Sequence, residues 1–218
     1  MTDATELDTD ASDAPPVRKR PKPGERRVQI LQALASMLEK PGGERITTAA
    51  LAARLQVSEA ALYRHFVSKA QMFEGLIEFI EHSVFSLVNQ IVEREDLAAD
   101  DGLDKGQRQA AKVARMLVQF AEKNPGMARV MVGDALVFEN ERLQQRMNQF
   151  FEKMESTFKQ CLREAVSTSG ATPSLLQAQV RAGVLVAFVV GRLQRYVRSG
   201  FKHLPSENLD HSLALLLG

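Results

Sequence analysis

The sequence has little of the chemistry that enzymes, metal sites and disulfide frameworks use. A single cysteine, Cys161, stands among 218 residues, which excludes an internal disulfide and a cysteine-based zinc site and fits a reducing cytoplasm. None of the four histidines forms an HxxxH pair, and no glycine-rich loop could cradle a phosphate. The sequence therefore predicts a protein that is not an enzyme and needs neither metal nor cofactor.

Long hydrophobic runs are also absent. The longest, AGVLVAFVV at 182–190, is too short to span a bilayer, so we expect a buried helical segment and no contact with a membrane. The first residues, MTDATELDTDASDAP, are acidic and polar, whereas a secretory signal peptide is basic and then apolar. Residues 1–23 are therefore predicted to form a disordered leader, acidic and then basic, of a cytoplasmic protein.

Positive charge is concentrated in one part of the chain. Residues 1–17 carry five acids and no Lys or Arg, whereas residues 18–70 carry eleven Lys or Arg and four acids, a balance of +7 in a chain of net charge +1. A basic head beside a neutral body is typical of a protein that neutralises nucleic-acid phosphates with one face. A solvated basic surface would give the same balance, so the charge alone leaves both interpretations open.

Apolar residues recur at helical spacing along nearly the whole chain, and no stretch alternates with a period of two. The prediction is an all-α fold, with a helix-turn-helix head at 24–84 and a larger helical dimerisation and regulatory domain at 85–218. The first helix is expected to end at Lys40, because Pro41 and two glycines follow. Its expected core stripe is Val28, Leu31, Leu34 and Leu38.

Two short helices and one long helix complete the predicted head. Thr47 or Thr48 can cap the first short helix, and Ser58 can cap the second, which buries Leu62 and Phe66. Ser68 and Gln71 fit a capping box that begins a long helix running from the head into the body. The apolar stripe of this long helix is Phe73, Leu76, Ile77, Ile80, Val84, Val88 and Ile91.

The body pattern predicts a loop at 93–106 and four main helices. They are a helix ending before Asn124, a helix from Met127 to Phe138, an amphipathic helix of local coiled-coil character from Glu141 to Val166, and, after a linker at 167–172, a helix capped by Thr172 and running to about Gly200. The last of these has small residues that would let two backbones approach closely, which makes it the expected dimer interface: Ala182, Gly183, Ala187 and Gly191. Internal packing is the alternative role for these four.

The segment ITTAALAARLQVSEAALYRHFVSKAQMF, at 46–73, resembles the helix-turn-helix of the TetR family. The resemblance implies a recognition helix that lies in the DNA major groove, with phosphate contacts from Tyr63 and Lys69. The turn position where the family usually has glycine is Gln56, which should cost a little stability. The arm VRKRPKPGERR at 17–27 is a second candidate DNA contact, with a solvated disordered tail as the alternative. The candidate DNA-binding residues are Thr47, Thr48, Ser58, Glu59, Ala60, Tyr63, Arg64, His65 and Lys69.

The strings SKAQMFEGLIEFIEHS and EKNPGMARVMVGDALVFENERLQQRMNQFFEKME resemble one branch of this family, the bacterial nucleoid occlusion factors. The resemblance implies a homodimer that binds palindromic chromosomal sites on double-stranded DNA, sits at the nucleoid and blocks division by binding the C-terminal tail of the tubulin-like protein FtsZ. The positions that match the tail groove are Phe79, Met116, Lys123 and Asn124. The basic residue of that groove is replaced here by Leu87, which puts the charge of the groove in doubt.

A ligand-responsive TetR-type repressor is the alternative function. It would couple a small molecule in the body to the spacing of the two heads. Met116, Met127, Met131 and Met154 could line an adaptable apolar cavity, but methionines at helical spacing are more often core residues.

Overall fold

The computed structural model describes residues 24–40, 46–93, 104–163 and 175–218, and these residues are helical with no strand. The all-α prediction is confirmed. In chain order the elements are α1 (Glu25–Leu38), α2 (Thr48–Arg54), α3 (Glu59–Tyr63), α4 (Lys69–Glu93), α5 (Lys105–Lys123), α6 (Pro125–Met131), the 3-10 turn η1 (Asp134–Leu136), α7 (Glu141–Arg163), α8 (Leu175–Arg198) and α9 (Leu209–Leu217). The predicted leader at 1–23, the linker at 167–172 and its cap at Thr172 lie outside the described residues.

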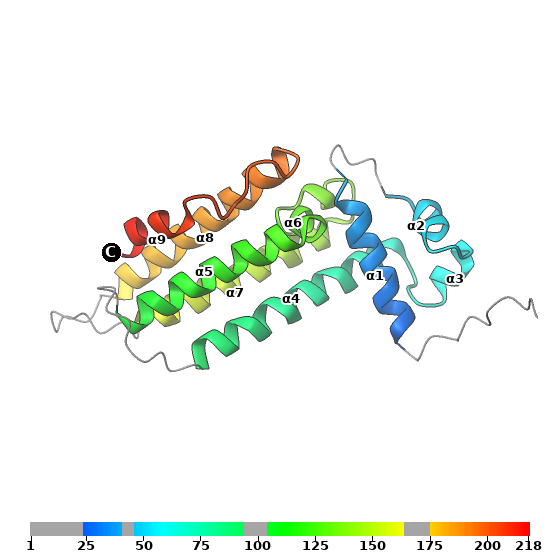
Figure 1. The fold of residues 1–218 in the computed structure, drawn as a ribbon. Coiled ribbons are helices and arrows are strands. Elements are labelled where there is room, and N and C mark those ends of the chain that lie inside the picture. Colours follow the sequence, from blue (N-terminus) through cyan, green and yellow to red (C-terminus); the bar gives the residue numbers. More distant parts are fainter. Residues whose placement is uncertain (1–23, 41–45, 94–103, 164–174) are drawn as a thin grey trace, which may run out of the picture.

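The molecule is elongated, with α1, α2 and α3 at one end and α5, α7, α8 and α9 at the other (Figure 1). Helix α4 begins in the head and runs into the body, as its unbroken apolar stripe predicted. Seven residues form that predicted stripe, and six of them are buried while Ile91 is only partly so. Because one helix carries core residues of both parts, the head is held against the body by a shared element.

Helix α1 faces the core with most of the predicted stripe, since Leu34 and Leu38 are buried and Leu31 packs against the core, but not with Val28. Its buried residues are Ile30, Leu34, Ala35 and Leu38, whereas Val28 is 46% exposed. The predicted stripe through Val28 is therefore wrong at its first position. The sequence offers two stripes with the same spacing, and the packing of α1 against α4 and α6 selects the one through Ile30.

The start of α4 differs slightly from the predicted capping box. The Ser68 hydroxyl accepts a hydrogen bond from the Gln71 backbone N–H at 3.1 Å, as expected. The Gln71 side chain, however, accepts from the backbone N–H of Val67 at 2.6 Å instead of that of Ser68. Both bonds satisfy donors around the first turn, so the helix begins where the pattern predicted.

The crossing of α1 and α6 requires a glycine. A Cβ on Gly126 would lie 2.0 Å from the backbone oxygen of Ala35. A change of side-chain rotamer could not relieve this clash, because the nearest atoms belong to the backbone of α1. Nearby, the Arg129 guanidinium donates to the backbone oxygens of Leu38 at 3.2 Å and Lys40 at 3.4 Å. These contacts cap the end of α1 and fix the head on the body.

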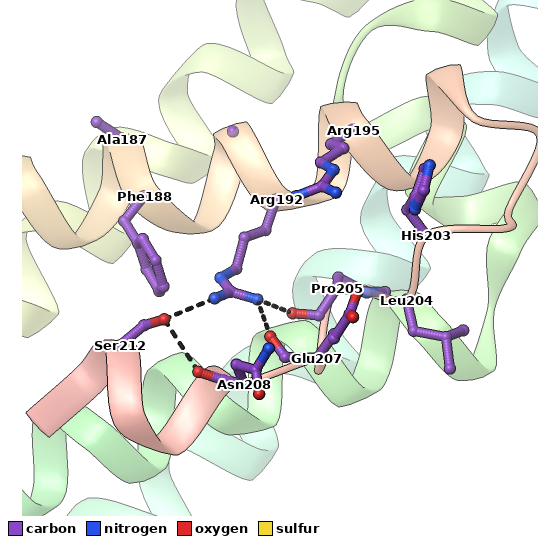
Figure 2. Close-up of a pocket in the computed structure, with 11 residues that line it drawn as sticks. Ala187, Phe188, Arg192, Arg195, His203, Leu204, Pro205, Glu207, Asn208 and Ser212 are labelled. Atoms are coloured by element: carbon purple, nitrogen blue, oxygen red, sulfur yellow. Dashed lines mark hydrogen bonds between the residues drawn. The ribbon is translucent and has the colours of Figure 1, made fainter.

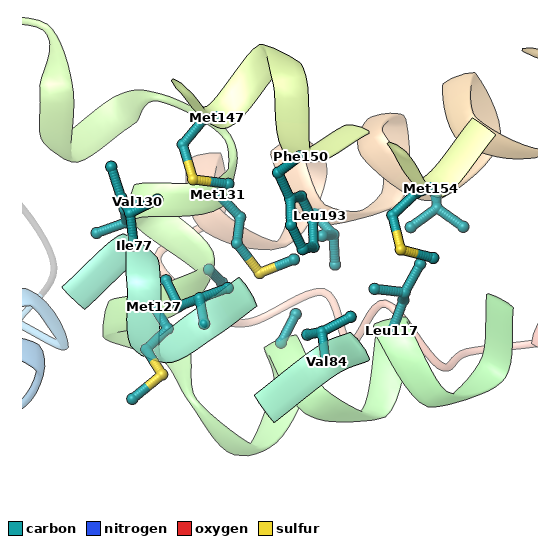
Figure 3. Packing of buried hydrophobic residues seen from close by; sticks show 14 of the residues in the cluster. Ile77, Val84, Leu117, Met127, Val130, Met131, Met147, Phe150, Met154 and Leu193 are labelled. Carbon is teal, nitrogen blue, oxygen red and sulfur yellow. The ribbon is translucent and has the colours of Figure 1, made fainter. Parts of the chain in front are cut away.

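The body core contains the methionines that could have lined a ligand cavity. Met127, Met131 and Met154 are at most 8% exposed and lie among apolar side chains of several helices (Figure 3). Phe150 is completely buried at the centre, with its ring 5.6 Å from that of Phe85 in an edge-on contact. These methionines therefore pack in the core, and Met116 is only partly buried at its edge.

Helix α6 is shorter than the predicted helix at 127–138. It ends at Met131, and Gly133 then adopts a left-handed φ of 79° before η1. Phe138, expected within the helix, is 75% exposed in the connection to α7. The prediction failed because the apolar residues beside Gly133 resemble a continuing helix. A glycine there can instead adopt the left-handed conformation that ends a helix.

Candidate nucleic-acid interface

The helix-turn-helix consists of α2, the turn after it and α3. Thr47 caps α2 by accepting from the Ala50 backbone N–H at 3.1 Å, and Ser58 caps α3 by accepting from Ala61 N–H at 3.3 Å. The sequence allowed either Thr47 or Thr48 as the cap of α2, and the structure identifies Thr47. The caps fix where each helix begins, and they set the orientation of the exposed face of α3.

Gln56, in the turn between α2 and α3, has a φ of 53°. This is the left-handed conformation for which glycine is preferred, because a Cβ crowds the backbone there. The predicted departure from the family pattern is thus confirmed in the backbone. The motif still forms, since the core residues beneath the turn, Leu51 and Leu62, are each 1% exposed.

Helix α3 has one buried side and one exposed side. Leu62 and, just beyond the helix, Phe66 are 1% exposed and hold α3 on the head, whereas the Tyr63 side chain is 45% exposed. The other predicted contact residues of this segment are also exposed: Ser58, Glu59, Ala60, Arg64 and His65. The structure therefore leaves all the predicted contact residues of the recognition helix exposed.

Thr48 and Glu59 contact each other. The Thr48 hydroxyl donates to a Glu59 carboxylate oxygen at 2.6 Å, which joins the start of α2 to the first turn of α3. A phosphate contact by Thr48 would compete with this bond. In the DNA-free chain, Glu59 thus stabilises the relative position of the two helices, a role that the sequence did not indicate.

Lys69 begins α4 and forms an ion pair with Glu139, from the segment between η1 and α7. Their side chains are 20% and 10% exposed, and the ammonium also lies 5.7 Å from the centre of the Phe73 ring. The predicted phosphate contact is therefore engaged within the chain when DNA is absent. The two residues are 70 positions apart, and no local pattern in the sequence could have paired them.

Arg27, at the start of α1, is the last residue of the predicted basic arm. The structure places its guanidinium 4.3 Å from the centre of the Phe66 ring, and it donates to the His65 backbone oxygen at 3.4 Å. Both partners lie at the end of the helix-turn-helix. Arg27 therefore belongs to the packing of the recognition helix as well as to the basic surface.

The predicted partner groove involves α4 and α5, two helices that pack against each other. Phe79 on α4 is 43% exposed, and Leu87 further along is 38% exposed. On α5, Lys123 is exposed and Met116 is partly buried. Asn124 lies where α5 ends, and its side-chain amide donates to the Phe120 backbone oxygen at 2.7 Å, which caps the helix.

Helix α8 has an exposed apolar face. Leu176, Val180 and Val184 are 71%, 56% and 45% exposed, and only 22% of its most apolar 18-residue window is buried. The expectation of a buried segment at 182–190 is therefore correct for only one side. By length and by a mean hydropathy of 1.3, α8 could also cross a membrane, but α7 packs along it and Arg181 interrupts the exposed face.

The four small residues expected at the dimer interface divide between two sides of α8. Ala182 is completely buried within the chain, so the prediction is wrong for this residue, which packs internally. Ala187 and Gly191 are exposed, and Gly183 is partly exposed. The large exposed residues on this helix include Leu176, Val180 and Val184, which the pattern of small residues does not predict.

A cavity of about 690 Å³ lies beside the end of α8, where the chain turns into α9 (Figure 2). Arg192 crosses it and donates to the backbone oxygens of Pro205 and Glu207 and to the Ser212 hydroxyl, each at 2.8 Å. Burial, and then repulsion from Arg195, lowers the pKa of Arg192. Because the guanidinium makes these bonds to the chain itself, it fixes α9 against α8.

Comparison with known proteins matches both parts of the chain to families of bacterial regulators. Residues 30–76 match the family described as bacterial regulatory proteins, tetR family, and residues 108–218 match the SlmA-like form of the tetracyclin repressor-like C-terminal domain. The chain is 52% identical over 198 residues to the nucleoid occlusion factor SlmA of Aliivibrio fischeri (strain MJ11), covering 90% of this chain and 96% of that protein. It is 48% identical to the SlmA of Colwellia psychrerythraea (strain 34H / ATCC BAA-681), with 88% and 92% covered.

Solved structures of bacterial regulators share the fold at low sequence identity. The regulator FadR from Bacillus subtilis, in complex with stearoyl-CoA, superposes with a TM-score of 0.67 at 15% identity, covering 88% of this chain and 97% of that one. FadR from Bacillus halodurans gives 0.70 at 17% identity, with 91% and 97% covered. At these identities the likeness concerns the fold alone.

Proposed function

We propose that this chain, which belongs to the TetR family and, within it, to the SlmA nucleoid occlusion factors, acts in nucleoid occlusion. As a homodimer it binds palindromic sites on chromosomal DNA, and in the bound state it antagonises the assembly of FtsZ. The observation that carries the DNA-binding part is the exposed face of α3, held on the head by Leu62 and Phe66, each 1% exposed. This binding places the protein at the nucleoid.

The DNA contact divides into positioning and reading. Tyr63 and Lys69 bind phosphates and fix the register of the head, since contacts to the backbone carry no sequence information. Base reading falls to the first turn of α3, where small Ser58 and Ala60 allow close approach to base edges. Arg64, exposed in the same segment, binds either a guanine edge or a phosphate.

The dimer forms through the exposed face of α8. Leu176, Val180 and Val184 expose apolar surface that a second copy of α8 would cover, and such contiguous apolar surface is typical of interaction sites. A two-fold axis through this face makes the contact self-complementary. It also places two heads on one palindrome, because each head reads one half-site.

The FtsZ tail binds at the surface of α4 and α5 that contains Phe79 and Lys123. An exposed aromatic side chain on α4 and an exposed cation at the end of α5 suit a peptide with an apolar anchor and an acidic group. Met116, at the edge of the core, extends the apolar part of the surface, and Asn124 holds the end of α5. Leu87 in place of a basic residue lowers the positive charge of this groove, so the contact depends more on Phe79.

The test is FtsZ assembly, followed by light scattering, with the purified chain and a palindromic duplex that the chain has selected from a random-sequence pool. We expect antagonism with the duplex and much less without it. Phe79→Ala should abolish the antagonism while leaving DNA binding intact. The matched control is Phe138→Ala, which removes another exposed phenylalanine, 75% exposed, and should change nothing.

Two results would contradict this function. FtsZ assembly that is unchanged by the chain with or without duplex would remove the division role. Release of the duplex by a small metabolite, together with that result, would instead establish the ligand-responsive repressor. The buried methionine cluster argues against such a ligand site in the body core, because those side chains already fill it.

A further inference from the structure

A pocket of about 520 Å³ lies between α1 and α4, and its wall includes Phe79 of the proposed FtsZ surface. Arg27 and Leu31 of α1 and Gly75 of α4 also line it. The pocket thus extends the partner surface from Phe79 toward α1, away from α5. It is the side of Phe79 that lies nearest to the helix-turn-helix.

The Arg27 side chain belongs to both the pocket and the end of the recognition segment. It lines the pocket, and the same guanidinium lies 4.3 Å from the centre of the Phe66 ring and donates to the His65 backbone oxygen at 3.4 Å. Phe66 is 1% exposed and closes the core under α3. A shift of this segment would therefore move one wall of the pocket.

The floor of the pocket touches the same ring. A Cβ placed on Gly75 would lie 3.2 Å from Cε1 of Phe66 and 3.3 Å from Cδ2 of Leu31. The absence of a side chain at Gly75 therefore allows the Phe66 ring and Leu31 to approach the pocket floor. Two separate contacts, through Arg27 and through Gly75, connect the pocket with Phe66.

We propose that Arg27 is the positioning residue that connects the DNA-contacting segment 58–66 with the pocket beside Phe79, and that it carries the coupling that the DNA-dependent antagonism requires. This inference rests on the proposed function. A duplex that holds Tyr63, Arg64 and His65 in place restrains the His65 carbonyl and the Phe66 ring. Arg27 is then fixed in the position that forms the pocket wall, and the peptide meets a site that is already ordered.

Linkage makes the proposal quantitative. If the duplex raises the affinity for the tail by a certain factor, the tail must raise the affinity for the duplex by the same factor. A coupling carried by one stacked guanidinium and one ring contact should be at the lower end of the usual range, about fivefold. Arg27 acts as a positioning residue, since the proposal needs no direct bond from it to the peptide.

The experiment measures binding of a fluorescent peptide with the FtsZ C-terminal tail sequence to the full chain, with and without a saturating selected duplex. The variants are Arg27→Ala and Gly75→Ala, and the matched control is Arg26→Ala. The Arg26 guanidinium donates to the Gln29 side chain at 2.9 Å. Its substitution by alanine removes the same charge from the same end of α1 as Arg27→Ala does. Thermal unfolding of each variant verifies that it folds.

We expect the wild-type chain and Arg26→Ala to bind the peptide about fivefold more tightly with duplex, and Arg27→Ala to show less than a twofold effect. Gly75→Ala changes no charge, displaces Phe66 or Leu31, and should also reduce the coupling. The reciprocal titration, duplex binding with and without saturating peptide, should give the same factors.

Coupling that is equal in wild type, Arg27→Ala and Gly75→Ala would overturn the inference, as would wild-type binding of the peptide that the duplex does not change. In both cases the FtsZ contact itself would stand. A wild-type chain that binds no peptide in either state would instead overturn the proposed function, and the coupling with it.

Discussion

Replacing Glu139 by glutamine should strengthen DNA binding, because in the proposed complex Glu139 competes with a DNA phosphate for Lys69. The Lys69–Glu139 ion pair joins the first residue of α4 to the segment before α7. Our proposal assigns Lys69 to a phosphate, so the wild-type chain must weaken or share this ion pair when it binds a duplex. Glutamine keeps the shape and one acceptor of glutamate but removes the charge that attracts the lysine.

The magnitude follows from the burial of the two side chains, which are 20% and 10% exposed. Fully exposed pairs contribute about 0.2–1 kcal/mol, and breaking a fully buried pair by removing one partner costs about 3–5 kcal/mol. For this partly buried pair, with glutamine still able to accept a hydrogen bond, we expect a loss of about 1 kcal/mol. That free energy corresponds to about a fivefold change in the DNA dissociation constant.

The assay is duplex binding by fluorescence anisotropy over a series of salt concentrations. We expect Glu139→Gln to bind about fivefold more tightly with little change in the slope of log affinity against log salt, because Lys69 contacts the same phosphate in both chains. The control is Glu141→Gln, which removes an exposed carboxylate two positions further on. Its effect should be small at moderate salt because the charge is screened.

One outcome would refute this reasoning. Suppose that Glu139→Gln and Glu141→Gln bind the duplex equally, and that Lys69→Ala in an otherwise wild-type chain binds it more weakly. Lys69 would then reach its phosphate without giving up Glu139. The ion pair would then be a structural bond of the junction, detectable only as a loss of about 1 kcal/mol in the free energy of unfolding.

Two further predictions concern the turn and the dimer. Gln56→Gly should raise the free energy of unfolding in urea by about 0.5 kcal/mol, because glycine relieves the left-handed φ but gains entropy in the unfolded chain; Gln56→Ala, which keeps the Cβ, should bring no such gain, and an equal gain would contradict the conformational explanation. Val184→Arg should yield a folded particle with the mass of one 24.2 kDa chain in light scattering and at least about a tenfold loss of palindrome affinity, since each head then binds alone; a variant that remains dimeric would exclude this face of α8 as the interface.

The elements that the sequence predicted well are those whose signals are local. The caps Thr47 and Ser58 and the long stripe of α4 are determined by residues within one or two helical turns of each other. The left-handed turn at Gln56 is of the same kind, since family resemblance placed it by its position between two short helices. The exposed face of α3 followed from Leu62 and Phe66, which determine its buried side.

The residues that the sequence did not reveal depend on contacts between distant segments. Glu139 lies in a stretch predicted to join two helices, and its pairing with Lys69 requires the body to be folded against the head. Val28 and Ile30 lie on nearly opposite sides of α1, and only the neighbouring helices decide which of the two is buried. Ala182 illustrates the same limit, because small residues on an apolar helix suit an internal contact and a dimer contact equally well.

The junction between head and body determines how a signal can pass through this fold. Gly126 brings α6 against α1, Arg129 caps the end of α1, and Lys69 joins α4 to Glu139, so that three separate contacts tie the head to the body. A repressor released by a ligand in the body would have to change these contacts from within a closely packed core. In the proposed complex a duplex acts on them directly, because Lys69 would bind a phosphate at the expense of Glu139, and because the proposed DNA-contacting segment also holds Arg27. The junction is therefore better placed to transmit the presence of DNA to the body than the presence of a ligand to the head, which is the direction that a DNA-activated inhibitor of division requires.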